Sequence, residues 1–147
     1  MDSIYIGADH RGYKLKEKLI DILKKENYAV VDVGNTKYDP EDDFPDYAMK
    51  LGEEVVANKS RGILVCGSGV GMSLAVNKVK GVRAGLCTTV KQVELAVSDN
   101  DINVLVLSSI LVSDEENIKI IYKFLNTVFA AEERYIRRIN KVNQYES

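Results

Sequence analysis

The chain has 147 residues, enough for one domain with a full hydrophobic core that needs neither a disulfide nor a metal. Its 20 basic and 22 acidic residues give a net charge of −2, which excludes a strongly basic surface for nucleic acid or an anionic membrane and favours small-molecule or protein partners. Two cysteines and one histidine exclude a disulfide framework and a His/Cys metal cluster, and no apolar run approaches membrane-spanning length, so we expect a reduced, cytoplasmic protein without a metal site.

Polar residues follow the first predicted strand, residues 4–8. Asp9 and His10 stand where this strand ends, and residues 13–26 then carry apolar side chains at helical spacing. A polar pair at the end of a strand suits contact with a ligand. The alternative interpretation is that His10 caps the following helix, but a histidine beside an aspartate at a strand end is more often a ligand contact in this fold.

An acidic loop separates the second predicted strand, residues 29–33, from the second helix, residues 46–58. Asp43 is the predicted N-cap of this helix, and Pro45 suits its first turn. No glycine or distal glutamate follows in the register of a calcium loop. We therefore expect a solvated acidic loop that contains Asp39, Glu41, Asp42 and Asp43.

A glycine-rich turn follows the third predicted strand, residues 62–66, and leads into a predicted helix over residues 72–79. Its sequence is Cys66-Gly67-Ser68-Gly69-Val70-Gly71. The amides of such a turn and of a helix N-terminus converge on one point, which suits an anion and favours Cys66 as a thiolate. The pattern predicts a reactive thiol beside an anion hole, and the alternative is an ordinary glycine turn with a buried cysteine.

The same alternation of strand and helix continues to the end of the predicted sheet. Strands are predicted over residues 82–87 and 104–107, and helices over residues 90–98 and 114–129. The strands are nearly continuous apolar runs, which is typical of strands covered on both faces. The chain therefore predicts a three-layer α/β/α fold with a five-stranded parallel sheet, Rossmann-like, in a single domain over residues 1–147.

The polar ends of two strands define a candidate active site. Ligands of open parallel sheets bind beyond the carboxyl ends of the strands, where the strand order reverses. If the second strand lies outside the first, the first and third strands are neighbours. Asp9, His10 and Cys66 then share one crevice.

The C-terminal segment, residues 130–142, is amphipathic and strongly charged, with Arg134, Arg137 and Arg138 close together. A last helix with so little core to cover is expected to pack on a second subunit. The alternative is a solvated terminal helix.

Five motifs in fixed order give a resemblance to a known family. They are Asp9-His10, Cys66-Gly67-Ser68-Gly69-Val70-Gly71 with Ser73, Asn77-Lys78, Asn100-Asp101-Ile102-Asn103-Val104-Leu105, and Arg134 with Arg138. From Ile4 to about Val142 the chain resembles the ribose-5-phosphate isomerase type B and galactose-6-phosphate isomerase family. The resemblance implies a small cytosolic homodimer or tetramer that interconverts aldose and ketose sugar phosphates without a metal or organic cofactor.

The resemblance also implies roles for individual residues. The family's catalytic base falls on Cys66, and its enediolate hole on the backbone of Gly67, Ser68, Gly69, Val70 and Gly71. Its sugar and phosphate contacts fall on Asp9, His10 and Asn100, and its phosphate arginines on Arg134 and Arg138. Aldose–ketose isomerisation needs a positioned base and donors for the developing oxyanion, which agrees with this transfer.

The chain departs from the family pattern at several positions. Asp99 stands where the family has the histidine that donates a proton in ring opening, and an aspartate with the reference pKa of about 3.9 is ionised at pH 7. Ile110 stands where many members carry an arginine, Tyr135 replaces a histidine, and Ser68 replaces a threonine. The alternative to an isomerase that uses Cys66 and Asp99 is therefore a non-catalytic or altered-specificity relative that binds sugar phosphates.

Other classes of protein fit the sequence less well. A cysteine phosphatase needs an arginine that closes its loop, where this chain has Met72 and Ser73. A phosphocysteine carrier usually has its cysteine after the first strand. A dinucleotide-binding domain also has its glycine loop after the first strand, whereas the loop here follows the third.

Asn100 precedes the fifth predicted strand, so we expect it at the amino edge of the sheet, away from Cys66. If both residues contact one substrate, a second subunit completes the site. The sequence thus predicts a homodimer at least, with two composite active sites.

Overall fold

The computed structural model describes residues 3–146, which form a parallel sheet and its covering helices. The strands are β1 (Ser3–Ala8), β2 (Ala29–Gly34), β3 (Arg61–Cys66), β4 (Ala84–Leu86) and β5 (Val104–Ser108). The helices are α1 (Tyr13–Lys25), α2 (Phe44–Ala57), α3 (Val70–Val76), α4 (Val90–Asn100), α5 (Asp114–Asn126) and α6 (Glu133–Tyr145). The predicted order of elements is confirmed.

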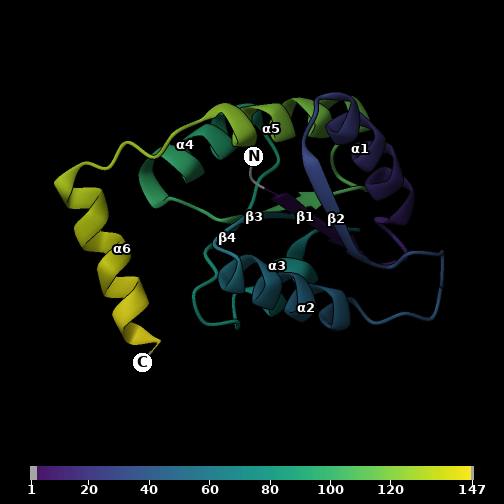
Figure 1. Ribbon diagram of the computed structural model, residues 1–147, viewed down its shortest axis with the longest axis horizontal. Helices are drawn as coiled ribbons and strands as arrows, with labels where there is room; N and C mark the ends of the chain where they lie inside the picture. Colours follow the sequence, from purple (N-terminus) through teal and green to yellow (C-terminus); the bar gives the residue numbers. More distant parts are fainter. Residues whose placement is uncertain (1–2, 147) are drawn as a thin grey trace.

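The strands lie in the order β2-β1-β3-β5-β4, and every neighbouring pair is parallel. Helices α1, α4 and α5 cover one face of the sheet, and α2 and α3 cover the other (Figure 1). This confirms the three-layer α/β/α fold. It also confirms that β1 and β3 are neighbours, so their carboxyl ends meet at one edge.

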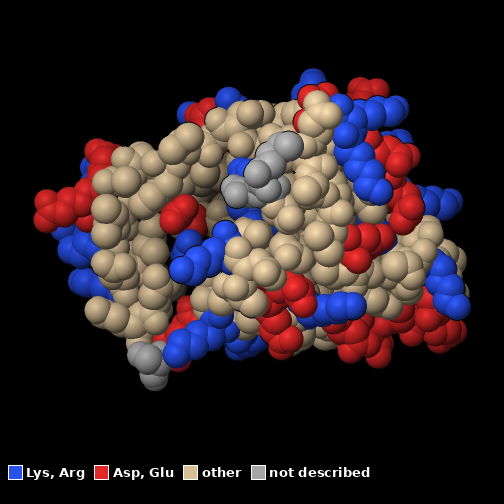
Figure 2. Space-filling model, viewed as in Figure 1, with Lys and Arg blue, Asp and Glu red and all other residues tan. Residues whose placement is uncertain are grey.

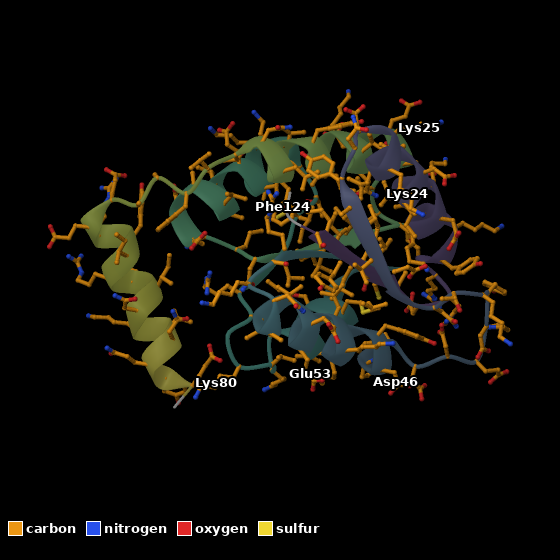
Figure 3. The ribbon with its side chains drawn as sticks, viewed as in Figure 1. Lys24, Lys25, Asp46, Glu53, Lys80 and Phe124 are labelled. Carbon is orange, nitrogen blue, oxygen red and sulfur yellow. The ribbon has the colours of Figure 1, made fainter. Side chains whose placement is uncertain are left out.

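Alternation along β3 divides its side chains between two hydrophobic cores. Ile63 and Val65 pack into the cluster under α1, α4 and α5, which includes Phe124 (labelled in Figure 3). Leu64 and Cys66 pack into the cluster under α2 and α3. The thiol at the end of β3 is therefore directed to the layer that contains the glycine-rich turn.

Some boundaries differ from the prediction. Helix α3 begins at Val70 rather than 72, so Val70 and Gly71 form its first turn. Strand β4 is shorter than residues 82–87, because the amide of Arg83 donates to Asn103 Oδ1 over 2.7 Å and the amide of Ala84 donates to the Asn77 side chain. Side chains thus hold the start of this segment in place of a longer ladder.

Helix α6 extends away from the rest of the chain (Figure 1). None of the described residues of α6 is buried, and neither core cluster includes a residue from it. The C-terminal end of α6 is joined to the loop before β4 by a hydrogen bond, which the Gly81 amide donates to Glu146 Oε2 over 2.7 Å. Within residues 3–146, no helix has both the length and the apolar character needed to cross a membrane.

Candidate active site

The carboxyl ends of β1 and β3 bring Asp9 and Cys66 into contact. The Cys66 thiol donates to Asp9 Oδ2, with 3.6 Å between Sγ and the oxygen, and both residues are buried. The other oxygen of Asp9 accepts from the amides of Arg11 and Gly12, over 3.0 and 3.1 Å. Asp9 therefore holds the turn before α1 and contacts the sulfur at the same time.

The prediction that the helix start favours Cys66 as a thiolate is wrong in its net effect. Burial, and then the Asp9 carboxylate, raise the pKa of the Cys66 thiol above its ordinary 9.0. Hydrogen bonds from the amides of Gly69, Met72 and Gly67 lower this pKa, as predicted, but by less. The sulfur of the free protein therefore keeps its proton at neutral pH.

Asp9→Asn should make Cys66 react faster with iodoacetamide at pH 8, because the substitution removes the charge that helps to raise the thiol pKa. In the unmodified protein the alkylation rate of each cysteine should rise as the pH passes the pKa of its thiol. That pKa is above 9.0 for Cys66, and burial raises the pKa of Cys87 to about 11. Mass spectrometry of the two cysteine peptides separates the rates. Cys87 is the internal control, and an unchanged or slower Cys66 would contradict this account of its environment.

The glycine-rich turn is fixed by its backbone and by the loop after β5. Gly69 has φ +85°, and a Cβ there would lie 2.4 Å from Leu86 Cδ1, so this position needs glycine. The Ser108 hydroxyl donates to the Gly67 carbonyl over 2.7 Å, and the Ile110 amide donates to the same oxygen over 3.1 Å. The turn is therefore held in one conformation beside Cys66.

Asp42 corrects the prediction of a solvated acidic loop. Its side chain is only 2% exposed, and its Oδ1 accepts from the His10 amide over 3.1 Å and lies 2.7 Å from His10 Nδ1. His10 does not cap α1: the N-cap residue is Gly12, and among the described residues no side chain caps this helix. Asp43 is the N-cap residue of α2, but among the residues that the structure describes its side chain caps no backbone amide.

Arg11 is a basic residue at this edge that sequence reasoning missed. A Cβ built on Gly67 would lie 2.8 Å from Arg11 Cδ and 3.0 Å from Ile110 Cδ1. The side chains of Arg11 and Ile110 thus flank the same point of the turn. The Arg11 guanidinium therefore lies at this edge of the sheet, where residue 110 is an isoleucine and not the arginine that many family members carry.

A second group of predicted site residues lies elsewhere. Asn100 ends α4 and shares a groove with Arg138 of α6, lined also by Arg83, Leu95, Ile102 and Val142. Figure 2 shows the surface hollowed between α6 and the rest of the molecule. Cys66 does not line this groove, and the start of β5 next to Asn100 pairs with Gly62, at the opposite end of β3 from Cys66.

Two further predicted residues have local partners. Asp99 Oδ1 accepts from the Ser98 hydroxyl over 2.8 Å. The guanidinium of Arg134 lies over the ring of Tyr135, donates to its hydroxyl over 3.0 Å and is 3.4 Å from Glu132. In one chain the predicted site residues therefore form two groups, one at the carboxyl ends of β1 and β3 and the other on α4 and α6, beside the β4 edge of the sheet.

A thiol–carboxylate pair beside a glycine turn, at the carboxyl edge of a parallel α/β sheet, is typical of the class of α/β proteins that bind small ligands at that edge. The family model described as Ribose/Galactose Isomerase matches residues 4–142, and the chain belongs to this family.

Individual relatives match over nearly the whole length. The chain is 46% identical over 144 residues to the probable ribose-5-phosphate isomerase B of Mycoplasma pneumoniae, covering 97% of this chain and 94% of the relative. It is 34% identical over 144 residues to ribose-5-phosphate isomerase B of Mycobacterium tuberculosis, covering 97% and 89%. The crystal structure of ribose-5-phosphate isomerase B from Mycoplasma genitalium with bound ribulose-5-phosphate is similar with a TM-score of 0.94 and 44% identity, covering 98% of this chain and 95% of that one.

Proposed function

We propose that this chain is an aldose–ketose isomerase that interconverts ribose 5-phosphate and ribulose 5-phosphate through an enediolate. The names of its relatives, and the ribulose-5-phosphate bound to the Mycoplasma genitalium structure, support the substrate. The observation that carries the chemistry is the 3.6 Å contact between Cys66 Sγ and Asp9 Oδ2, beside amides that hydrogen-bond to the same sulfur.

Cys66 acts as the base that moves a proton between C1 and C2. The thiol first passes its own proton to Asp9 Oδ2, its hydrogen-bond acceptor. The thiolate then takes the proton from the carbon next to the carbonyl, and the electrons of the broken C–H bond move to the carbonyl oxygen as the enediolate forms. A proton then passes from the neighbouring hydroxyl oxygen to the former carbonyl oxygen, and the thiol returns the first proton to the other carbon, which gives the isomer. Asp9 finally returns its proton to the Cys66 thiolate.

The backbone from Gly67 to Gly71 stabilises the enediolate oxygen. Because the bonds from Ser108 and Ile110 fix this turn, its amides need no reorganisation during the reaction. Removal of one donor from an oxyanion hole typically costs about 2.7–4 kcal/mol. Asp9 and His10 contact the sugar phosphate from the same edge of the sheet.

The other group of site residues supports a composite active site. Asn100 and Arg138 share a groove that Cys66 does not line, and α6 is joined to neither core. Asn100, Asp99, Arg134 and Arg138 of one subunit therefore complete the crevice of another, and the guanidinium groups bind the phosphate. The assembly is a homodimer, or a tetramer made of two such dimers, and the reaction uses no metal or organic cofactor.

A binding protein without isomerase activity is the second candidate function, favoured by Asp99, Ile110 and Tyr135 at positions where the family has basic residues. Incubation of the pure protein with ribulose 5-phosphate and detection of the aldose separates the two. An isomerase forms aldose at a rate proportional to protein concentration. A binding protein converts no ribulose 5-phosphate to the aldose, however tightly it binds the sugar.

Asp99→His should speed turnover that starts from cyclic ribose 5-phosphate more than turnover that starts from ribulose 5-phosphate. The ketose cannot close to a furanose and needs no ring opening, whereas a histidine at position 99 supplies a proton donor for the cyclic aldose. Initial rates with each sugar, for both proteins, measure the difference. An equal effect in both directions would remove residue 99 from the ring-opening step.

A further inference from the structure

The His10 side chain is held by an acidic residue from a different part of the chain. Asp42 Oδ1 lies 2.7 Å from His10 Nδ1 and also accepts from the His10 amide, over 3.1 Å. The His10 side chain is 28% exposed and that of Asp42 only 2%. One buried carboxylate therefore fixes both the backbone and the ring of a residue that adjoins Asp9.

Asp42 is itself held in place by Asn35, which contacts Lys16 in turn. Asn35 Nδ2 donates to Asp42 Oδ2 over 3.4 Å, and the Asn35 carbonyl accepts from the ammonium group of Lys16. Lys16 is fully buried on α1 and also pairs with Asp32 over 2.8 Å. Because these contacts connect Asp42 to α1 and β2, the carboxylate cannot move freely with its loop.

The contact decides which nitrogen of the ring carries a proton. A carboxylate only accepts hydrogen bonds, so the 2.7 Å contact requires a proton on Nδ1. Nε2 is then the ring nitrogen left for a ligand, with its lone pair in the neutral imidazole. This one oxygen acceptor, held at a fixed place, gives His10 one tautomer and one orientation.

We propose that Asp42 is a positioning residue for the isomerase reaction, which holds His10 as the Nδ1–H tautomer and so presents Nε2 to the sugar phosphate. This inference rests on the proposed function, because it gives His10 the substrate contact assigned above. Asp42 acts only through His10 and does not touch the substrate.

The tautomer can be observed directly, because His10 is the one histidine of the 147 residues. Long-range ¹H–¹⁵N spectra of the labelled protein should show a single imidazole with Nδ1–H and an unprotonated Nε2 at a pH where the ring is neutral. In Asp42→Ala the ring should shift toward the Nε2–H tautomer, since its acceptor is lost. Asp42→Asn keeps an oxygen that can accept from Nδ1 and should largely keep the original tautomer.

Kinetics separate positioning from a general loss of structure. Asp42→Ala should lower kcat/KM by on the order of 10²-fold, as expected when a substrate-contacting group is misplaced. Asp42→Asn should lose less. In a His10→Ala background the same Asp42→Ala change should have almost no further effect, because the group that it positions is gone. Asp43→Ala is the matched control, since its exposed carboxylate belongs to the same loop, and its kinetics should equal those of the parent.

Three results would overturn the proposal: an Nε2–H tautomer in the unmodified protein, an unchanged tautomer in Asp42→Ala, or an equal loss of kcat/KM with and without His10. The first needs no variant and so does not depend on the folding of Asp42→Ala. If the unmodified protein fails to isomerise ribulose 5-phosphate, the proposed function is wrong, while the spectra still decide how Asp42 holds His10.

Discussion

Cys66→Ala should lower kcat for ribulose 5-phosphate by about 10²–10⁴-fold, because the substitution removes the base that carries the proton between C1 and C2. The same variant should stop the exchange of solvent deuterium into the sugar, which NMR detects at the exchanging carbon. Exchange reports the C–H bond-breaking step even when net turnover is slow. Loss of both signals would tie the sulfur to that step.

Cys87→Ala is the matched control for this experiment. Cys87 is a buried thiol in the opposite core cluster, so its loss leaves the contact between Cys66 and Asp9 at the end of β3 intact. Its activity per folded molecule should equal that of the parent. Undiminished deuterium exchange in Cys66→Ala would show that another group is the base.

A random mixture of Cys66→Ala and Arg138→Ala subunits should recover about a quarter of the unmodified activity, and the isolated mixed dimer about a half, although each variant alone is inactive. If Cys66 and Arg138 of one site come from different subunits, one of the two sites in a mixed dimer has both residues. Random pairing makes half of the dimers mixed. Coexpression with two affinity tags isolates the mixed species, and its activity is then measured directly.

The control pair is Cys66→Ala with Asp9→Asn. Asp9 and Cys66 are in contact within one chain, so every site of this mixed dimer lacks one of them. It should recover no activity. Purified mixed dimers of the first pair that remain inactive would place Cys66 and Arg138 in the same subunit and contradict the composite site.

The fold could be predicted because its signals are local. The apolar runs that become β1, β3 and β5 are buried along almost their whole length, and amphipathic segments separate them. The polar pair after β1 and the cysteine at the end of β3 then indicated that the site lies at the carboxyl edge of the sheet. Strand β4 was overestimated because it is an edge strand whose start is held by side chains rather than by a ladder.

Contacts between distant residues could not be predicted in the same way. Asp42 lies 32 positions from His10, and in sequence it is one of several acids in a polar loop. Nothing in that pattern distinguishes the one carboxylate that becomes buried. Arg11 was missed for a similar reason, because only the folded chain brings its side chain to Gly67 and next to Ile110.

The pKa of Cys66 is a further property that could not be predicted from the sequence. The sequence indicates the amides that lower its pKa, and these amides are present. It does not indicate how deeply the sulfur is buried or that Asp9 lies 3.6 Å away, and both raise the pKa. The sign of a pKa shift depends on this balance, which is fixed only by packing.

The isolation of α6 from both cores affects how this protein can change over generations. Substitutions in a helix without buried side chains cost the fold little, so selection acts there mainly on what the helix recognises. The double glutamate before Arg134 and the tyrosine after it lie in this tolerant region. In the composite site proposed above, new ligand preferences can therefore arise at the C-terminus while the sheet and its thiol stay as they are.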